Sequence, residues 1–184
     1  MRPGAQQIVD VTYSAGGMRS VVSPRAKSQL FVANYDYLFK VRRETASQTF
    51  IPSLGVGLHS LLASTNYLPN VELPVTYLTA TAFLTLSGNV LYRLNKRNQV
   101  RMQIALPVAG IVYRPDFEIN GKTLTRLTAP GKGGLFFVKL EYAYTISRAL
   151  DITATYQYNY FSFDEPRPIA ILQGGLFFGI RKKF

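Results

Sequence analysis

The sequence predicts an all-β protein, an eight-stranded antiparallel up-and-down β-barrel that crosses a membrane. Three observations predict this fold. Eight stretches alternate apolar and polar residues with the two-residue period of a β-strand. The connections between them alternate between long and short, and the polar faces carry mainly Thr, Gln and Asn with few charges. The 184 residues suit a single barrel domain, residues 1–184.

The first four predicted strands each place an apolar residue at every second position. Gly16 and Gly17 end the first strand, and a loop with two prolines separates the third from the fourth. The four strands span residues 7–15, 29–42, 50–61 and 75–94. Their apolar faces hold Val9, Val11 and Tyr13; Phe31, Tyr35 and Phe39; Leu54, Val56 and Leu58; and Leu84, Leu86 and Tyr92.

The last four predicted strands follow a tight turn at 95–98 and span residues 99–113, 136–146, 152–160 and 170–184. Pro107 lies inside the fifth strand, where a paired strand tolerates proline poorly, so we expect a β-bulge or the membrane boundary there. The longest loop, 114–134, comes next. The apolar faces hold Met102, Ile104 and Leu106; Val138, Leu140 and Tyr142; Ile152, Tyr156 and Tyr160; and Leu172, Leu176 and Phe178.

The alternating connections favour a membrane barrel over a soluble sandwich. Such barrels have an even number of strands, short periplasmic turns and longer external loops, with the apolar face toward lipid and a polar interior. With both termini in the periplasm, this chain reproduces that pattern. Tyrosines near the strand ends suit an interfacial aromatic girdle.

Composition excludes several other classes. No apolar run is long enough for a transmembrane helix, and the absence of cysteine excludes disulfides and thiolate metal sites. The 21 Lys and Arg against 10 Asp and Glu could indicate nucleic acid, but no nucleic-acid motif is present and an anionic lipid surface explains the charge equally well. The first residues lead into polar sequence, so for an exported chain we expect the mature form.

The last fifteen residues end an alternating strand on an aromatic residue, with Leu176, Phe178, Ile180 and Phe184 on one face. This resembles the C-terminal assembly signal of bacterial outer-membrane β-barrels, although Lys182 stands where an aromatic is usual. The whole chain is similar in architecture to small eight-stranded barrels such as the OmpA and OmpX transmembrane domains. The resemblance implies a Gram-negative outer membrane, insertion by the barrel assembly machinery, and contact with lipopolysaccharide or a larger envelope complex.

The inward face carries charges of both signs. We expect them to pair across the interior and close it without a pore, because an uncompensated buried charge is costly. This predicted salt-bridge network contains Asp10, Asp36, Lys40, Arg42, Arg101, Lys139, Glu141 and Arg181.

Basic residues of the external loops are candidates for contacts with lipopolysaccharide phosphates, which Arg and Lys suit. An ordinary solvated loop surface explains them equally well. The candidates are Arg19, Arg25, Lys27, Arg114, Lys122, Arg126 and Lys132.

We expect a protein without catalysis, cofactor or metal, acting as a structural, surface-interaction or complex-accessory component. His59 is the only histidine, and Ser60 beside it points to the opposite face of its strand, so a serine hydrolase pair is disfavoured. Two alternatives remain: a lipid A-modifying enzyme that uses His59, and a soluble lipocalin-like barrel with an apolar interior.

Overall fold

The computed structural model describes residues 4–18, 26–41, 49–67, 75–119, 122–129, 132–164 and 169–182. Within these ranges the chain forms nine β-strands, and no described helix is long and apolar enough to cross a membrane. The strands are β1 (Ala5–Met18), β2 (Ala26–Lys40), β3 (Phe50–Tyr67), β4 (Val75–Arg93), β5 (Asn98–Ile119), β6 (Lys122–Thr128), β7 (Gly133–Ser147), β8 (Leu150–Phe163) and β9 (Ile169–Lys182).

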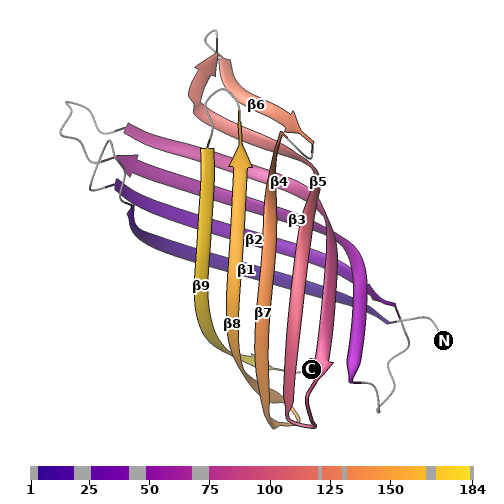
Figure 1. Ribbon diagram of the computed structural model, residues 1–184. Coiled ribbons are helices and arrows are strands. Elements are labelled where there is room, and N and C mark those ends of the chain that lie inside the picture. The colour runs from indigo at the N-terminus through magenta and orange to yellow at the C-terminus, as the bar shows by residue number, and fades with distance from the viewer. Residues whose placement is uncertain are drawn as a thin grey trace.

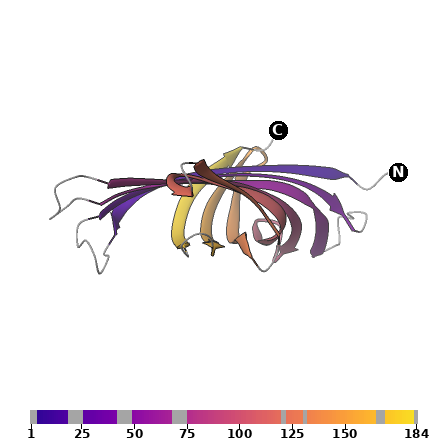
Figure 2. The ribbon, with the colours of Figure 1, turned by 90° about the horizontal axis from the view of Figure 1, so that it is seen from above.

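The strands form one antiparallel sheet in the order β1-β2-β3-β4-β5-β7-β8-β9, with β6 paired to β5 beside this path. The predictions of an all-β fold and of antiparallel pairing are confirmed. The sheet curls into a half-barrel, and Figure 2 shows it as an open trough. Within the described ranges no backbone pairing joins β1 to β9, so these two strands are the edges of the sheet.

Two features of β5 differ from a regular strand. Its pairing with β4 passes from Leu84↔Ala109 to Thr85↔Pro107, which leaves Val108 outside the register. The bulge expected at Pro107 is therefore confirmed. β5 also continues to Ile119 and pairs with β6, so the predicted loop 114–134 is wrong: much of it is a hairpin that extends the sheet (Figure 1). β3 likewise runs past its predicted end.

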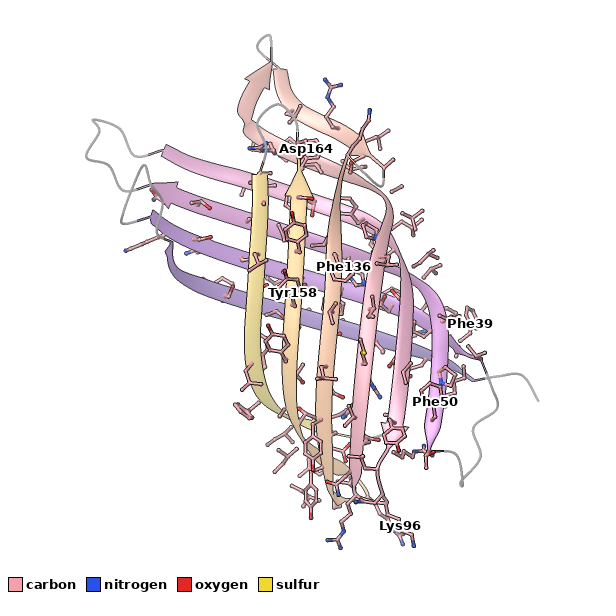
Figure 3. The ribbon with its side chains drawn as sticks, in the orientation of Figure 1. Phe39, Phe50, Lys96, Phe136, Tyr158 and Asp164 are labelled. Atoms are coloured by element: carbon pink, nitrogen blue, oxygen red, sulfur yellow. The ribbon has the colours of Figure 1, made fainter. Side chains whose placement is uncertain are left out.

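The two faces of the sheet invert the pattern of a soluble protein. Large apolar side chains of the outer face are exposed, as for Phe39 and Phe50, which point away from the sheet in Figure 3. Polar side chains of the inner face are buried, among them Thr85, Gln103 and Asn159. The predicted assignment of faces agrees with this burial on most of the predicted strands. It fails on β5 after Val108, where the bulge turns Val112 inward, and on β9, where Phe177 of the predicted inner face is 38% exposed.

The interior has two parts. We call the end of the sheet with the turns at 94–97 and 148–149 the turn end, and the opposite end the loop end; Lys96 and Asp164 mark them in Figure 3. At the loop end an apolar cluster fills the curl: Leu30, Val32, Leu61, Ala63, Phe83, Val112, Leu124, Leu135, Phe161 and Phe163. Within the described residues the interior is therefore apolar at the loop end and polar toward the turn end. Polar alternation gives way near the loop end because inner positions of β2, β3 and β8 become apolar there.

Candidate functional site

A carboxylate lies at the centre of the interior, where four strands contribute side chains. Asp36 on β2 accepts hydrogen bonds from Ser87 on β4 and from Gln103 on β5, whose Nε2 lies 2.7 Å from Asp36 Oδ2. The Nε2 atom of His59, on β3, lies 3.0 Å from Asp36 Oδ1. Each of these four side chains is at most 2% exposed. We call them the Asp36 cluster.

The Asp36 cluster corrects the predicted role of its carboxylate. Asp36 was expected in a network with Lys and Arg, yet its described partners are a hydroxyl, an amide and an imidazole. The register explains the difference. Asp36 stands opposite Gly57, and a Cβ at Gly57 would lie 2.2 Å from Asp36 Oδ1. The missing side chain leaves room for the carboxylate against the sheet, next to His59 rather than near the cations of the turn end.

His59 is buried between the Asp36 carboxylate and an aromatic ring. Its ring lies 5.3 Å from that of Phe137, edge to face, and its Nδ1 has no hydrogen-bond partner among the described residues. Ser60 donates to the Ala33 carbonyl at 3.0 Å, and Ser87 bonds to the carboxylate rather than to the imidazole. Within the described part of the chain, no serine is therefore hydrogen-bonded to the only histidine.

The charges near the turn end form two groups. Arg181 lies 3.0 Å from Glu141 and 3.6 Å from Asp151, and Arg101 stands opposite Glu141 in the β5–β7 ladder. Asp151 also accepts a hydrogen bond from Thr145 at 2.7 Å. The expected network thus unites Arg101, Glu141 and Arg181. The predicted network did not include Asp151. Its position on the inner face of β8, two residues before Thr153, could have indicated it.

The second charged group lies between strands from the two edges of the sheet and spans the interior. Lys139 on β7 forms an ion pair with Asp10 on β1. Gln173 on β9 donates to Ser14 on β1 at 2.8 Å. In the described ranges, the inner face of β1 therefore contacts the inner faces of β7 and β9 through side chains.

A cavity of about 260 Å³ opens beside Arg101 at the turn end. Its lining includes Lys40 on β2 together with the neutral polar residues Gln6, Ser53 and Asn89. Arg42, also assigned to the charged network, lies outside the described residues.

The predicted lipopolysaccharide contacts occupy different environments. Lys27, Arg126 and Lys132 are exposed near the loop end. Arg114 is only 3% exposed, so its assignment to the loop surface is wrong: the bulge at Val108 shifts the phase of β5 and turns this residue inward. Arg19 and Arg25 lie outside the described residues, as does the side chain of Lys122.

The predicted assembly signal lies on the edge strand β9. Leu176, Phe178 and Ile180 are 62%, 76% and 73% exposed on its outer face, and Phe184 lies outside the described residues. Among the described residues no three His, Cys, Asp or Glu side chains gather where they could hold a metal ion. No protein-family model, curated protein or solved structure matches the chain.

Proposed function

We propose that this chain is an integral outer-membrane protein, an eight-stranded barrel closed by pairing of β1 with β9. The observation that carries the proposal is the exposed apolar outer face over a buried polar interior. Soluble monomers rarely expose an apolar surface larger than a few hundred Å². Here exposed large apolar side chains occur on every strand from β1 to β9 in the described ranges. Lipid is the environment that matches such a surface.

Two side-chain contacts between the edge regions of the sheet support closure of β1 against β9. The side-chain contacts Lys139–Asp10 and Gln173–Ser14 bring β1 close to β7 and β9. In the hydrocarbon of a bilayer, each backbone N–H or C=O group without a hydrogen-bond partner costs on the order of several kcal/mol. The open edges would therefore be strongly driven to pair with each other on insertion.

The proposed role is non-catalytic. The interior is occupied by the apolar cluster and the Asp36 cluster, which supports a barrel without a continuous pore that acts through its loop end. The exposed cations Lys27, Arg126 and Lys132 near that end suit contact with lipopolysaccharide phosphates. Insertion by the barrel assembly machinery and membership of a larger envelope complex belong to the same proposal.

The soluble lipocalin-like alternative requires the opposite polarity of the outer face. A soluble barrel needs a polar outer face, whereas this outer face is apolar on neighbouring strands.

The test is folding in the two environments. We expect the purified chain to aggregate in aqueous buffer and to refold in a non-ionic detergent. The refolded protein should migrate differently on a gel before and after boiling, because a closed barrel resists unfolding by dodecyl sulfate. A protein that remains monomeric and folded without detergent would overturn the proposal.

A further inference from the structure

The contacts between the two edge regions of the sheet indicate how the edge strands would pair. In the described part of the chain, β1 and β9 each have a backbone partner on one side only. Gln173 on β9 nevertheless donates to Ser14 on β1, with 2.8 Å between Nε2 and Oγ. Both side chains belong to the inner face, so this contact places Ser14 opposite Gln173.

A second contact gives the same register. Thr12 Oγ1 on β1 lies 3.5 Å from Gln157 Oε1 on β8. Gln157 is paired with Gly175 on β9, which has no side chain to stand between Gln157 and β1. Thr12 therefore belongs opposite Gly175. The positions Ser14–Gln173 and Thr12–Gly175 are successive inner positions of one antiparallel ladder, because each strand advances by two residues between them.

The pairing already present in the sheet shows what this register would close. One row of paired residues crosses all eight strands of the main path, and each member stands opposite the next. In order, the row contains Gln6, Leu38, Gly55, Ser87, Ala105, Phe137, Asn159 and Gln173. With Ser14 opposite Gln173, the row returns to β1 eight residues beyond its start at Gln6. This displacement is the shear of a closed barrel, and it sets the tilt of the strands and the width of the interior.

A shear of eight suits a barrel of eight strands. Such a barrel closes with a strand tilt of about 36°, and its side chains fill the interior. The inner face of β9 also fits β1 in this register. Gly175 and Gly179 would face Thr12 and Ile8, and the partly exposed Phe177 between the glycines would gain β1 as a neighbour on its open side.

We propose that β1 and β9 pair antiparallel with Ser14 opposite Gln173, which closes the eight strands with a shear of eight. The closure itself rests on the proposed function, whereas the register and the shear go beyond it. A slip of one residue would turn the inner face of one strand outward. The competing registers are therefore slips of two residues in either direction.

The test is disulfide formation in the full chain refolded in non-ionic detergent. The chain has no cysteine, so two introduced cysteines report on one position alone. The register places Val11 opposite Leu176, and both are exposed on the outer face. A disulfide requires Cα atoms about 4.4–6.8 Å apart, a separation that directly opposite residues of a ladder meet. We expect Val11→Cys with Leu176→Cys to form a cross-link within one chain under mild oxidation.

Two matched pairs represent the slipped registers: Val11→Cys with Phe178→Cys, and Val9→Cys with Leu176→Cys. Each should cross-link at least about tenfold more slowly, because diagonal neighbours lie about 7–8 Å apart. Val11→Cys with Ala33→Cys is the positive control, since these two residues are paired between β1 and β2.

Failure of the register and failure of the closure give different results. Fastest cross-linking in a slipped pair would refute the register and leave a closed barrel. Cross-linked dimers would contradict both the register and the closure. The same holds if no β1–β9 pair cross-links while the Val11–Ala33 control does. If the cysteine pairs prevent refolding, NOEs between amide protons of β1 and β9 in the unsubstituted protein give the register: NOEs that match Ser14 opposite Gln173 support it, and NOEs offset by two residues exclude it.

Discussion

Asp36 shows how a single side chain organises the centre of this interior. It is fully buried, and its carboxylate oxygens contact groups from three other strands. Transfer of a carboxylate from water into the protein interior costs free energy unless hydrogen bonds in the interior compensate for it. Here Ser87, Gln103 and His59 supply them, so the carboxylate ties β2 to β3, β4 and β5.

The space that holds the carboxylate comes from Gly57, and its loss is our first prediction at this scale. In Gly57→Ala the new methyl group would overlap Asp36 Oδ1, at 2.2 Å, and Thr85 Oγ1, at 2.7 Å. Overpacking of a filled interior costs ~1–3 kcal/mol. We expect a lower urea midpoint in detergent.

Gly88→Ala is the control for this substitution. The nearest atom to a Cβ at Gly88 belongs to the Leu54 side chain at 3.7 Å, an ordinary contact. Its midpoint should stay near that of the wild type. Equal effects of the two substitutions would mean that glycine flexibility, rather than the room beside Asp36, sets the cost.

Glu141 is the residue whose charge matters most at the turn end. It pairs with Arg181 and stands opposite Arg101 in the ladder. Glu141→Gln leaves two guanidinium groups near one remaining carboxylate, Asp151, and breaking a buried pair costs ~3–5 kcal/mol. We expect the free energy of unfolding in urea to fall by an amount in the lower part of that range. The reason is that Arg181 is partly exposed and keeps its contact with Asp151.

A charge-balancing second substitution distinguishes electrostatics from packing. Arg101→Gln added to Glu141→Gln removes one of the two uncompensated cations, so part of the lost stability should return. A double variant that is less stable than Glu141→Gln by the full cost of Arg101→Gln alone would show that the charges act independently.

At the scale of single strands, β5 shows what alternation predicts and where it stops. The proline signal located the bulge correctly, because a missing amide and a fixed φ are readable from the residue type. The change of phase beyond the bulge was not readable. Arg114 therefore seemed a loop residue, although it is an inward residue of a strand that continues to Ile119.

The hairpin of β5 and β6 was missed for a related reason. Its residues lie beside turn-forming sequences, Asn120-Gly121 and the glycines at 131, 133 and 134, which by themselves predict a loop. In the hairpin, β5 pairs with β6 from Gly110↔Thr128 to Arg114↔Leu124. This pairing depends on how the residues before the turn match the residues after it. Single-strand alternation carries no such information about pairing.

The outer face of β7 provides a prediction about membrane depth. Leu140 lies near the middle of the strand and Ile146 near its turn end; they are 47% and 51% exposed. An arginine on the lipid face costs ~2–4 kcal/mol at the midplane and about 0–1 near the interface. In lipid vesicles Leu140→Arg should therefore reduce the free energy of unfolding much more than Ile146→Arg. Equal, small losses would contradict a lipid-facing β7.

For the whole molecule, the sequence predicted the strands and their faces better than it predicted the interior. Alternation is a local property, so it identified the outward Leu54, Leu84 and Leu140 correctly. The contents of the interior depend on which strands face one another across the curl. The contact of Phe83 on β4 with Phe161 on β8, with ring centroids 6.3 Å apart, could not be predicted from either strand alone.

The state of the two edges is the prediction that belongs to the complete sheet. If β1 and β9 pair when the protein is inserted, their amides should exchange with deuterium as slowly as those of β7. In an open sheet, alternate amides of β1 and β9 would instead exchange quickly. Hydrogen exchange read by NMR in micelles decides between the two. The central strand β4, which has a partner on each side, is the internal reference.

The apolar cluster at the loop end has a consequence for how stability varies with temperature. Heat capacity rises on unfolding when apolar surface passes from a dry interior into water. Leu30, Phe83, Phe161 and their neighbours meet that condition. The outer apolar face does not, if lipid or detergent covers it before and after unfolding. The curvature of stability against temperature would then reflect this small cluster alone, and the protein would resist cold denaturation better than a soluble chain of equal apolar content.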